Sequence, residues 1–234
     1  MNVLGLDTST AATAVCLLRA DGESFEVVPD PSDLFSRPAH ARELMPALVR
    51  VLDHGGLGFP DLDAVAVGRG PGTFTGLRIG IATARAIASA RSLPVHSVSS
   101  LAALAAGAEG EGAAAGASVL AAIDARRGEV FAALFHPGGR ELWAPWVAAP
   151  EGVAGRVREG GVTPLAVGDG AVRFRAELES AGARVPADDD ARHAVRGLHV
   201  CRFAARVAPS APEAIVPDYL RQPDAVPQTP RRPR

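Results

Sequence analysis

The chain has 234 residues, 47% of them hydrophobic, and its 24 basic side chains against 26 acidic ones leave a net charge of -2. That balance excludes a broad attraction to nucleic acid or to a membrane surface, although a local basic spot stays open. All the basic side chains are arginine, so a Schiff-base lysine and a phosphate-loop lysine are excluded. Cys16 and Cys201 are too few for a disulfide framework or a zinc site.

The N-terminus and the hydropathy pattern favour a soluble protein of the cytoplasm. MNVLGLDTST reaches Asp7 before an apolar run of signal-peptide length can form. No apolar run approaches the roughly 20 residues that a membrane span needs. We therefore expect a reduced, cytoplasmic chain that has no membrane contact.

The first half of the chain alternates apolar runs with turns. Strands are predicted at 2–7, 13–19, 23–28, 62–68 and 93–98. The first strand ends at Asp7, whose side chain is expected to point into a cleft, and Asp21-Gly22 signals a tight hairpin. Helical spacing predicts helices at 39–56, 77–90 and 99–108.

The second half repeats this pattern. Strands are predicted at 118–124, 129–135 and 163–168, and helices at 150–159, 171–181 and 193–208. The small, flexible stretch 107–117 suggests a boundary between a domain at 1–109 and a domain at 110–221, whose last helix packs back on the first. The tail 222–234 is too rich in proline and charge to fold alone. Two similar α/β halves, with mixed sheets flanked by helices, suggest an actin-like or sugar-kinase-like fold.

The stretch GRGPGTFTGLRIGIATARAIA, residues 68–88, places glycines before a helix, where a phosphate loop is the first hypothesis. The GxxxxGK[ST] loop needs a lysine after its last glycine, but Leu77 follows Gly76. The dinucleotide loop GxGxxG fails because Thr73 stands where its third glycine is required. The esterase elbow GxSxG is matched only by GTFTG, which has Phe74 at the nucleophile position.

A structural role for these glycines remains. Gly76, Gly80, Ala84 and Ala88 recur every four residues and form a stripe of small side chains along the helix. Such a stripe allows the backbone of a partner helix to approach closely. It equally allows the helix to pack closely on its own sheet, and spacing alone does not choose between the two.

The segment GPGTFTGLRIG, residues 70–80, resembles the signature of the TsaB family, also called YeaZ. Weaker matches occur in order at MNVLGLDTST, HARELMPALVRVL, LDAVAVGRGPGTFTGLRIG, DARRGEVF, VGDGA and PDYLR. The resemblance covers residues 1–221. It implies a two-domain fold of the actin, Hsp70 and sugar-kinase (ASKHA) type.

The same resemblance implies a role in making threonylcarbamoyladenosine, a modified base beside the tRNA anticodon. The TsaB-like subunit is expected to be a non-catalytic partner of TsaD, its metal- and nucleotide-binding paralogue, with the ATPase TsaE completing the machinery. The resemblance also implies self-association through the helices predicted at 39–56 and 77–90, which would contact the paralogue as well. The expected contact residues, for the paralogue or for a second copy, are Leu44, Leu48, Gly76, Gly80 and Ala84. Whether tRNA touches this subunit stays open.

No catalytic or metal-binding residue is predicted. The histidines stand at 40, 54, 96, 136, 193 and 199. None of them has a second histidine one helical turn away, so the paralogue's metal pair is missing. There is no HExxH motif, and no sequence signal pairs a serine or cysteine nucleophile with a base.

Binding of ATP by the isolated chain is not expected. Actin-like proteins hold phosphates between two hairpin turns, and the first turn here would be vestigial, formed by Asp7, Thr8, Ser9 and Thr10. In the second turn Asp124 is followed by Ala125, Arg126 and Arg127, whose side chains crowd a phosphate cradle, although an arginine can also contact a phosphate directly.

Three functions remain in competition at this point. The leading hypothesis is a scaffold or activator subunit in tRNA threonylcarbamoylation. The second is a stand-alone ATP-dependent kinase or carbamoyl-transfer enzyme of the actin-like superfamily, which the incomplete phosphate turns oppose. The third is a glycoprotease-like peptidase, which the missing nucleophile and base oppose.

Overall fold

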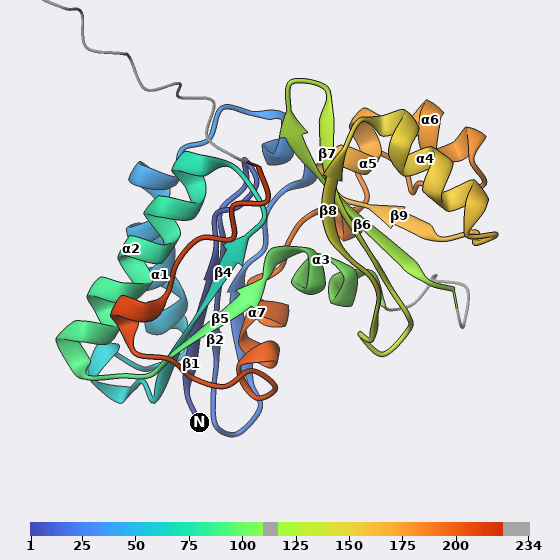
Figure 1. The fold of residues 1–234 in the computed structure, drawn as a ribbon. Coiled ribbons are helices and arrows are strands. Elements are labelled where there is room, and N and C mark those ends of the chain that lie inside the picture. Colours follow the sequence, from blue (N-terminus) through green and yellow to red (C-terminus); the bar gives the residue numbers. More distant parts are fainter. Residues whose placement is uncertain (110–116, 222–234) are drawn as a thin grey trace, which may run out of the picture.

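A computed structural model describes residues 1–109 and 117–221, and its first half is built on one mixed sheet (Figure 1). The strands are β1 (Val3–Asp7), β2 (Ala14–Leu18), β3 (Ser24–Val27), β4 (Ala64–Gly70) and β5 (Val95–Ser99), in the order β3-β2-β1-β4-β5. The first three form an antiparallel meander, whereas β4 and β5 run parallel to β1. Each lies where an apolar run predicts it.

The second sheet repeats this pattern with one strand fewer. Its strands are β6 (Val119–Arg126), β7 (Glu129–Phe135), β8 (Glu141–Ala148) and β9 (Leu165–Val167), in the order β8-β7-β6-β9. The first three are again antiparallel neighbours, and β9 runs parallel to β6. Strand β8 is absent from the sequence prediction because Pro145 interrupts its apolar pattern.

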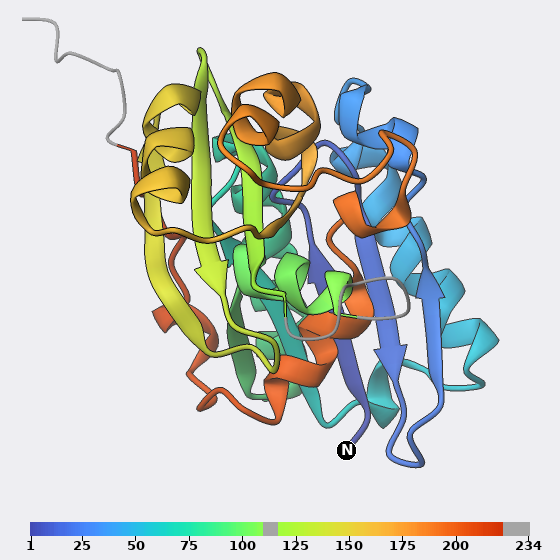
Figure 2. The same ribbon diagram turned by 90° about the vertical axis from the view of Figure 1, so that its right-hand side faces the viewer.

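Helices cover both sheets and fill the space between them. α1 (His40–His54) and α2 (Phe74–Arg91) pack on one face of the first sheet, while α3 (Ser100–Ala108) and α7 (Gly197–Ala204) lie on the side toward the second sheet (Figures 1 and 2). The outer face of the second sheet is covered by α4 (Pro150–Glu159), α5 (Asp169–Arg173) and α6 (Arg175–Ser180). The helix predicted at 171–181 is therefore two short helices that meet at Phe174. Short 3-10 helices occur at Pro31–Phe35, Phe59–Asp61, Ala191–His193 and Pro212–Ala214.

One hydrophobic cluster joins the two halves. It combines Cys16 and Ala66 of the first sheet, Ile123 of the second, Leu104 of α3 and Val200 of α7. The last helix thus belongs, by its packing, to the first sheet as well as to its own half. The predicted boundary between 109 and 110 and the predicted disorder of 222–234 lie outside the described residues.

Helix α7 approaches the first sheet closely. A Cβ atom on Gly5 would lie 2.5 Å from the Cys201 Sγ, and one on Gly197 would lie 2.6 Å from the Val15 carbonyl carbon. The buried carboxylate of Glu26 accepts hydrogen bonds from the Arg196 Nε at 3.0 Å and from the Leu198 N–H at 3.2 Å. Glu26 therefore fixes the first turn of α7 to the edge of the sheet.

The stripe of small residues on α2 also faces inward. A Cβ atom on Gly76 would lie 2.0 Å from the Thr8 carbonyl oxygen, and one on Gly80 would lie 2.3 Å from the Thr8 Oγ1. The Thr8 hydroxyl donates to the Gly76 carbonyl at 2.7 Å. Ala84 is fully buried in the core beneath α1 and α2. The small residues therefore let α2 pack closely on this chain's own sheet and turn, and they do not face a partner helix.

This geometry corrects the predicted partner contacts. The assignment to a partner interface is wrong for Leu44, Leu48, Gly76, Gly80 and Ala84. Leu44 and Leu48 pack in the same core as Ala84, and all five residues are buried within the monomer. A partner cannot reach them while the chain stays folded.

We expect Gly80→Leu to destabilise the monomer. The new side chain would displace Thr8 and break its hydrogen bond to α2, which together outweigh the gain in helix propensity. A net loss of about 2 kcal/mol corresponds to a melting point lower by roughly 4–8 °C for a chain of this size. Ala86→Leu, on the exposed face of the same helix, should melt near the parent. Equal melting of parent and Gly80→Leu would contradict the inward stripe.

Candidate functional site

The turn after β1 is the first candidate site, and it is buried. Asp7, Thr8, Ser9 and Thr10 are each at most 2% exposed. The Asp7 Oδ1 accepts hydrogen bonds from the Ser9 N–H at 2.7 Å and the Ser9 hydroxyl at 2.6 Å, and its Oδ2 accepts one from the Ser100 hydroxyl at 2.6 Å. Burial raises the pKa of Asp7, and these hydrogen bonds oppose the rise. Both oxygens of the Asp7 carboxylate thus accept hydrogen bonds from groups of the chain itself.

The glycine-rich loop covers this turn. The Thr73 N–H donates to the Ser9 carbonyl at 2.8 Å, and a Cβ atom on Gly72 would lie 2.5 Å from the Ser9 Cβ. A Cβ atom on Gly68 would lie 1.7 Å from the Asp7 Oδ2. These glycines allow loop and turn to touch. Both backbone groups of Ser9, the centre of the turn, are therefore satisfied without a ligand.

His40 fixes the other side of the turn. Its Nε2 donates to the Thr10 carbonyl at 3.0 Å, and its Nδ1 accepts from the Thr13 hydroxyl at 2.8 Å. Desolvation lowers the pKa of His40, so the ring is neutral at pH 7. The pairing of a hydroxyl with an imidazole is typical of nucleophilic catalysis. A base in such a dyad is oriented by a third group, often a carboxylate, and a backbone carbonyl takes that position here.

The second candidate turn, after β6, is occupied by arginine. The Asp124 carboxylate accepts from the Arg126 N–H at 2.8 Å and the Arg126 Nη1 at 3.0 Å, and it also meets the Arg173 Nη1 at 3.3 Å. Arg126 and Arg127 have φ angles of 65° and 54°, so the turn uses left-handed residues. The Arg126 side chain folds over Asp124 at the position where a phosphate cradle would need open backbone.

Asp169 forms a hydrogen bond to the backbone of this second turn. It is buried, and its Oδ1 accepts from the Asp124 N–H at 3.0 Å and the Gly170 N–H at 2.9 Å. Desolvation raises the pKa of Asp169 to about 6, and the nearby charge of Asp124 adds to the rise. The sequence pattern does not single out this carboxylate, because spacing does not reveal burial.

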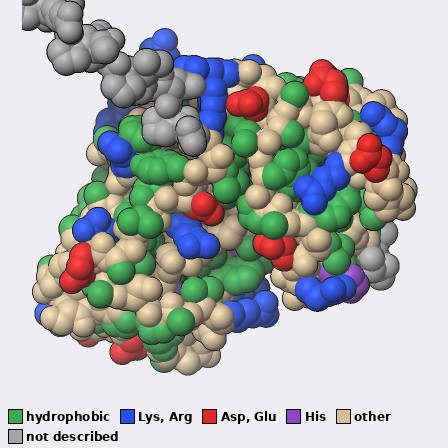
Figure 3. Space-filling view, viewed as in Figure 1, with side chains coloured by type: hydrophobic (Ala, Val, Ile, Leu, Met, Phe, Trp, Pro, Cys, Tyr) green, Lys and Arg blue, Asp and Glu red, His purple; other side chains and the backbone are tan. Residues whose placement is uncertain are grey.

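A surface of different character lies on the outer side of α1 and α2. Met45, Val49 and Phe74 are 47%, 43% and 48% exposed, on the faces opposite the buried leucines and glycines. The Phe74 ring stacks on Tyr219 with centroids 5.5 Å apart, and the Arg78 guanidinium carbon lies 3.8 Å from the Phe74 centroid. Figure 3 shows hydrophobic side chains and arginines on the half of the molecule that carries α2, and on the other half as well. The sequence prediction overlooked these residues because it followed the small-residue stripe.

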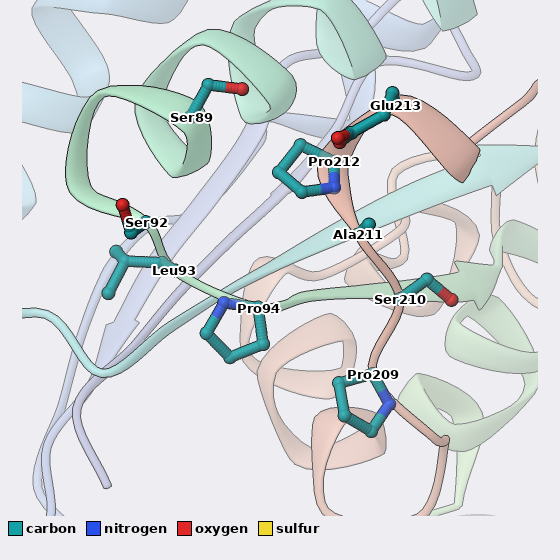
Figure 4. A pocket seen from close by; sticks show the side chains of 9 residues that line it. All are labelled: Ser89, Ser92, Leu93, Pro94, Pro209, Ser210, Ala211, Pro212 and Glu213. Carbon is teal, nitrogen blue, oxygen red and sulfur yellow. The ribbon is translucent and has the colours of Figure 1, made fainter.

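A hollow at the C-terminal end of α2 is lined by few groups that could take part in catalysis (Figure 4). It has a volume of about 610 Å³ and is lined by Ser89, Ser92, Leu93, Pro94, Pro209, Ser210, Ala211, Pro212 and Glu213. Ser210 bridges to Val95 at the edge of the first sheet. No imidazole or thiol is in this lining, and Glu213 is its one carboxylate.

Within residues 1–109 and 117–221, no three histidine, cysteine, aspartate or glutamate side chains gather as metal ligands. The described helices include none with the length and apolar character to cross a bilayer. The buried aspartates of the described residues are Asp7, Asp124 and Asp169, and all three belong to the two closed turns.

We expect Asp169→Asn to remove a pH-dependent part of the stability. The pKa of this acid is about 6 in the folded chain and 3.8 ordinarily, so its protonated form adds stability that is lost as the pH rises through 6. Between pH 5 and 7.5 the parent should lose about 1 kcal/mol relative to the variant, measured by urea unfolding. Asp189→Asn, at an exposed position, is the matched control. A constant difference across this range would contradict the raised pKa.

Known proteins resemble this chain over most of its length. A model of the TsaD family, described as tRNA N6-adenosine threonylcarbamoyltransferase, matches residues 32–164. The tRNA threonylcarbamoyladenosine biosynthesis protein TsaB of Escherichia coli is 38% identical over 146 residues, which are 61% of this chain and 58% of that protein. An uncharacterized protein of Mycobacterium tuberculosis is 35% identical over 225 residues, 96% of this chain and 94% of that protein. The match thus spans little more than half of the E. coli relative.

The solved structure of YeaZ from Pseudomonas aeruginosa is 31% identical, has a TM-score of 0.75, and is covered in full by 93% of this chain. A second structure, titled as an uncharacterized protein similar to the peptidase YeaZ of that organism, has a TM-score of 0.76 at 35% identity. The predicted α/β class, with mixed sheets flanked by helices, is confirmed. The chain belongs to the TsaB/YeaZ family.

Proposed function

We propose that this chain is a non-catalytic subunit in the formation of the threonylcarbamoyl group on the tRNA adenosine next to the anticodon. Two relatives carry the printed name tRNA threonylcarbamoyladenosine biosynthesis protein TsaB at 38% and 40% identity. One structural observation carries the proposal: both turns that could hold phosphates are closed by the chain's own groups, while the outer face of α1 and α2 is exposed. The proposed assembly acts in the cytoplasm with TsaD and TsaE.

The outer face of α1 and α2 is the proposed docking surface for the TsaD paralogue. It replaces the buried stripe as the contact region. Phe74, Tyr219 and Arg78 hold one another in place, and rigid aromatic and arginine side chains are the usual anchors of protein interfaces. Met45 and Val49 extend the surface along α1. A second copy of this chain would use the same residues, so heterodimer and homodimer compete.

A stand-alone ATP-dependent kinase or carbamoyl-transfer enzyme is the second candidate. The fold class favours it, whereas the turn chemistry opposes it: the Ser9 N–H is held by Asp7, and the Arg126 side chain covers Asp124. We propose that the isolated chain binds ATP no tighter than about 1 mM, or roughly -4 kcal/mol. A micromolar dissociation constant in calorimetry would favour this second candidate.

We expect the pure chain to leave tRNA unmodified when it is given threonylcarbamoyl-adenylate. Adding the TsaD paralogue should restore turnover, because the proposed role is support of the paralogue's chemistry. The measurement is transfer of a labelled threonylcarbamoyl group from the adenylate to tRNA, with the paralogue alone as control. Robust incorporation by this chain alone would overturn the non-catalytic assignment.

We expect Met45→Glu to weaken the complex with the paralogue at least tenfold. A buried, unpaired carboxylate at the centre of an interface costs more than the roughly 1.4 kcal/mol that corresponds to a factor of ten. Leu142→Glu, on β8 and 37% exposed, is the matched control and should bind normally. Analytical ultracentrifugation measures both. Unchanged binding by Met45→Glu, with weakened binding by Leu142→Glu, would move the interface to the second sheet.

A further inference from the structure

A hollow in the first half of the chain is lined by three arginines. It has a volume of about 540 Å³ and lies between the end of β3, the 3-10 helix Pro31–Phe35 and α1. Arg37, Arg42 and Arg50 line it, and all three are exposed. Within the described residues, none of their guanidinium groups forms a hydrogen bond or an ion pair. The volume falls in the range of ligand-binding sites, roughly 300–1,000 Å³.

This arrangement differs from that of other arginines in the chain. Arg19, Arg175 and Arg196, for example, each meet a carboxylate. Two carboxylates, Asp33 and Glu43, also line the hollow, but neither lies within ion-pair distance of its arginines. Three cations that face one hollow repel one another, and a bound anion would relieve that repulsion.

The hollow also has an apolar wall. Val27, Val28, Pro29 and Pro46 line it beside the arginines. Val28 is 50% exposed, so this wall is open to solvent. Guanidinium groups bind phosphate oxygens through two parallel hydrogen bonds, and an apolar surface beside them suits a sugar or an unstacked base. Exposed cations spread over two elements fit a chain of phosphates better than they fit one enclosed group.

We propose that this hollow binds the phosphate backbone of RNA, and that it is a contact of this subunit with the tRNA whose modification it supports. The inference rests on the proposed function for the identity of the RNA. The hollow reaches Ala11, Ala12 and Thr13 at the end of the turn after β1, but its lining includes none of residues 7–10 and none of the turn after β6. The net charge of -2 gives no general attraction, so contact with RNA depends on local groups such as these.

The test measures binding of an unmodified tRNA transcript to the isolated full chain by fluorescence anisotropy across a salt series. The double variant Arg42→Gln/Arg50→Gln should lose about tenfold or more in affinity, and its salt slope should fall by about 1.4–1.8, the value for two lost phosphate contacts. Arg42→Lys/Arg50→Lys should keep most of the slope because it keeps the charges. Arg85→Gln/Arg158→Gln removes two exposed arginines elsewhere and should bind like the parent.

Unchanged affinity and slope in the first double variant would overturn the proposal, as would a parent chain that does not bind tRNA. Displacement of tRNA by micromolar tripolyphosphate at constant ionic strength would also overturn it, in favour of a small-anion site. The proposed function is tested separately, through restored turnover with the paralogue. An unchanged salt slope with turnover restored would overturn the RNA site alone, and a reduced slope without restored turnover would overturn the proposed function alone.

Discussion

The close contact between α2 and the turn after β1 is the constraint on which the rest of the structure depends. Gly76 and Gly80 lie against Thr8 because neither carries a Cβ atom, and Gly72 lies against Ser9 for the same reason. This contact fixes the rotation of α2 about its axis, so Phe74 and Arg78 must face outward. It also buries Asp7 and its hydroxyl partners, which closes the turn. The closed turn and the exposed helix face therefore have a common cause.

Much of the fold follows from local sequence patterns. Apolar runs locate the five strands of the first sheet. Strand β1 ends at Asp7 as predicted, whereas β6 continues past Asp124 to Arg126. Strand β8 could not be predicted, because Pro145 weakens its pattern and its place at the edge of the sheet comes from pairing with β7 and from packing of Trp143 and Trp146 in the tertiary fold. The direction of the α2 stripe could not be predicted either. Small residues at four-residue spacing look the same whether a sheet or a second helix approaches them.

The candidate sites divide in the same way. The absence of a lysine and of paired histidines can be read from the sequence alone. The hydrogen bonds that close the two turns are visible only in the structure. The aromatic surface formed by Phe74 and Tyr219 joins residues 145 positions apart, which only the tertiary fold can bring together. The hollow lined by Arg37 and Arg50 is equally a product of folding, because it needs the loop after β3 to pack beside α1.

The position of α7 sets the order in which the chain can mature. Residues 197–204 cover one face of a sheet whose strands all lie before residue 100, and Glu26 on β3 holds the start of that helix. During synthesis, which adds about 5–20 residues per second, the first sheet must wait several seconds for this cover. Until α7 is made, Cys16 and Ala66, which are buried in the shared core of the folded chain, face solvent or another protein that covers them. A nascent chain of this kind has an apolar face for which a folding chaperone is the natural temporary partner.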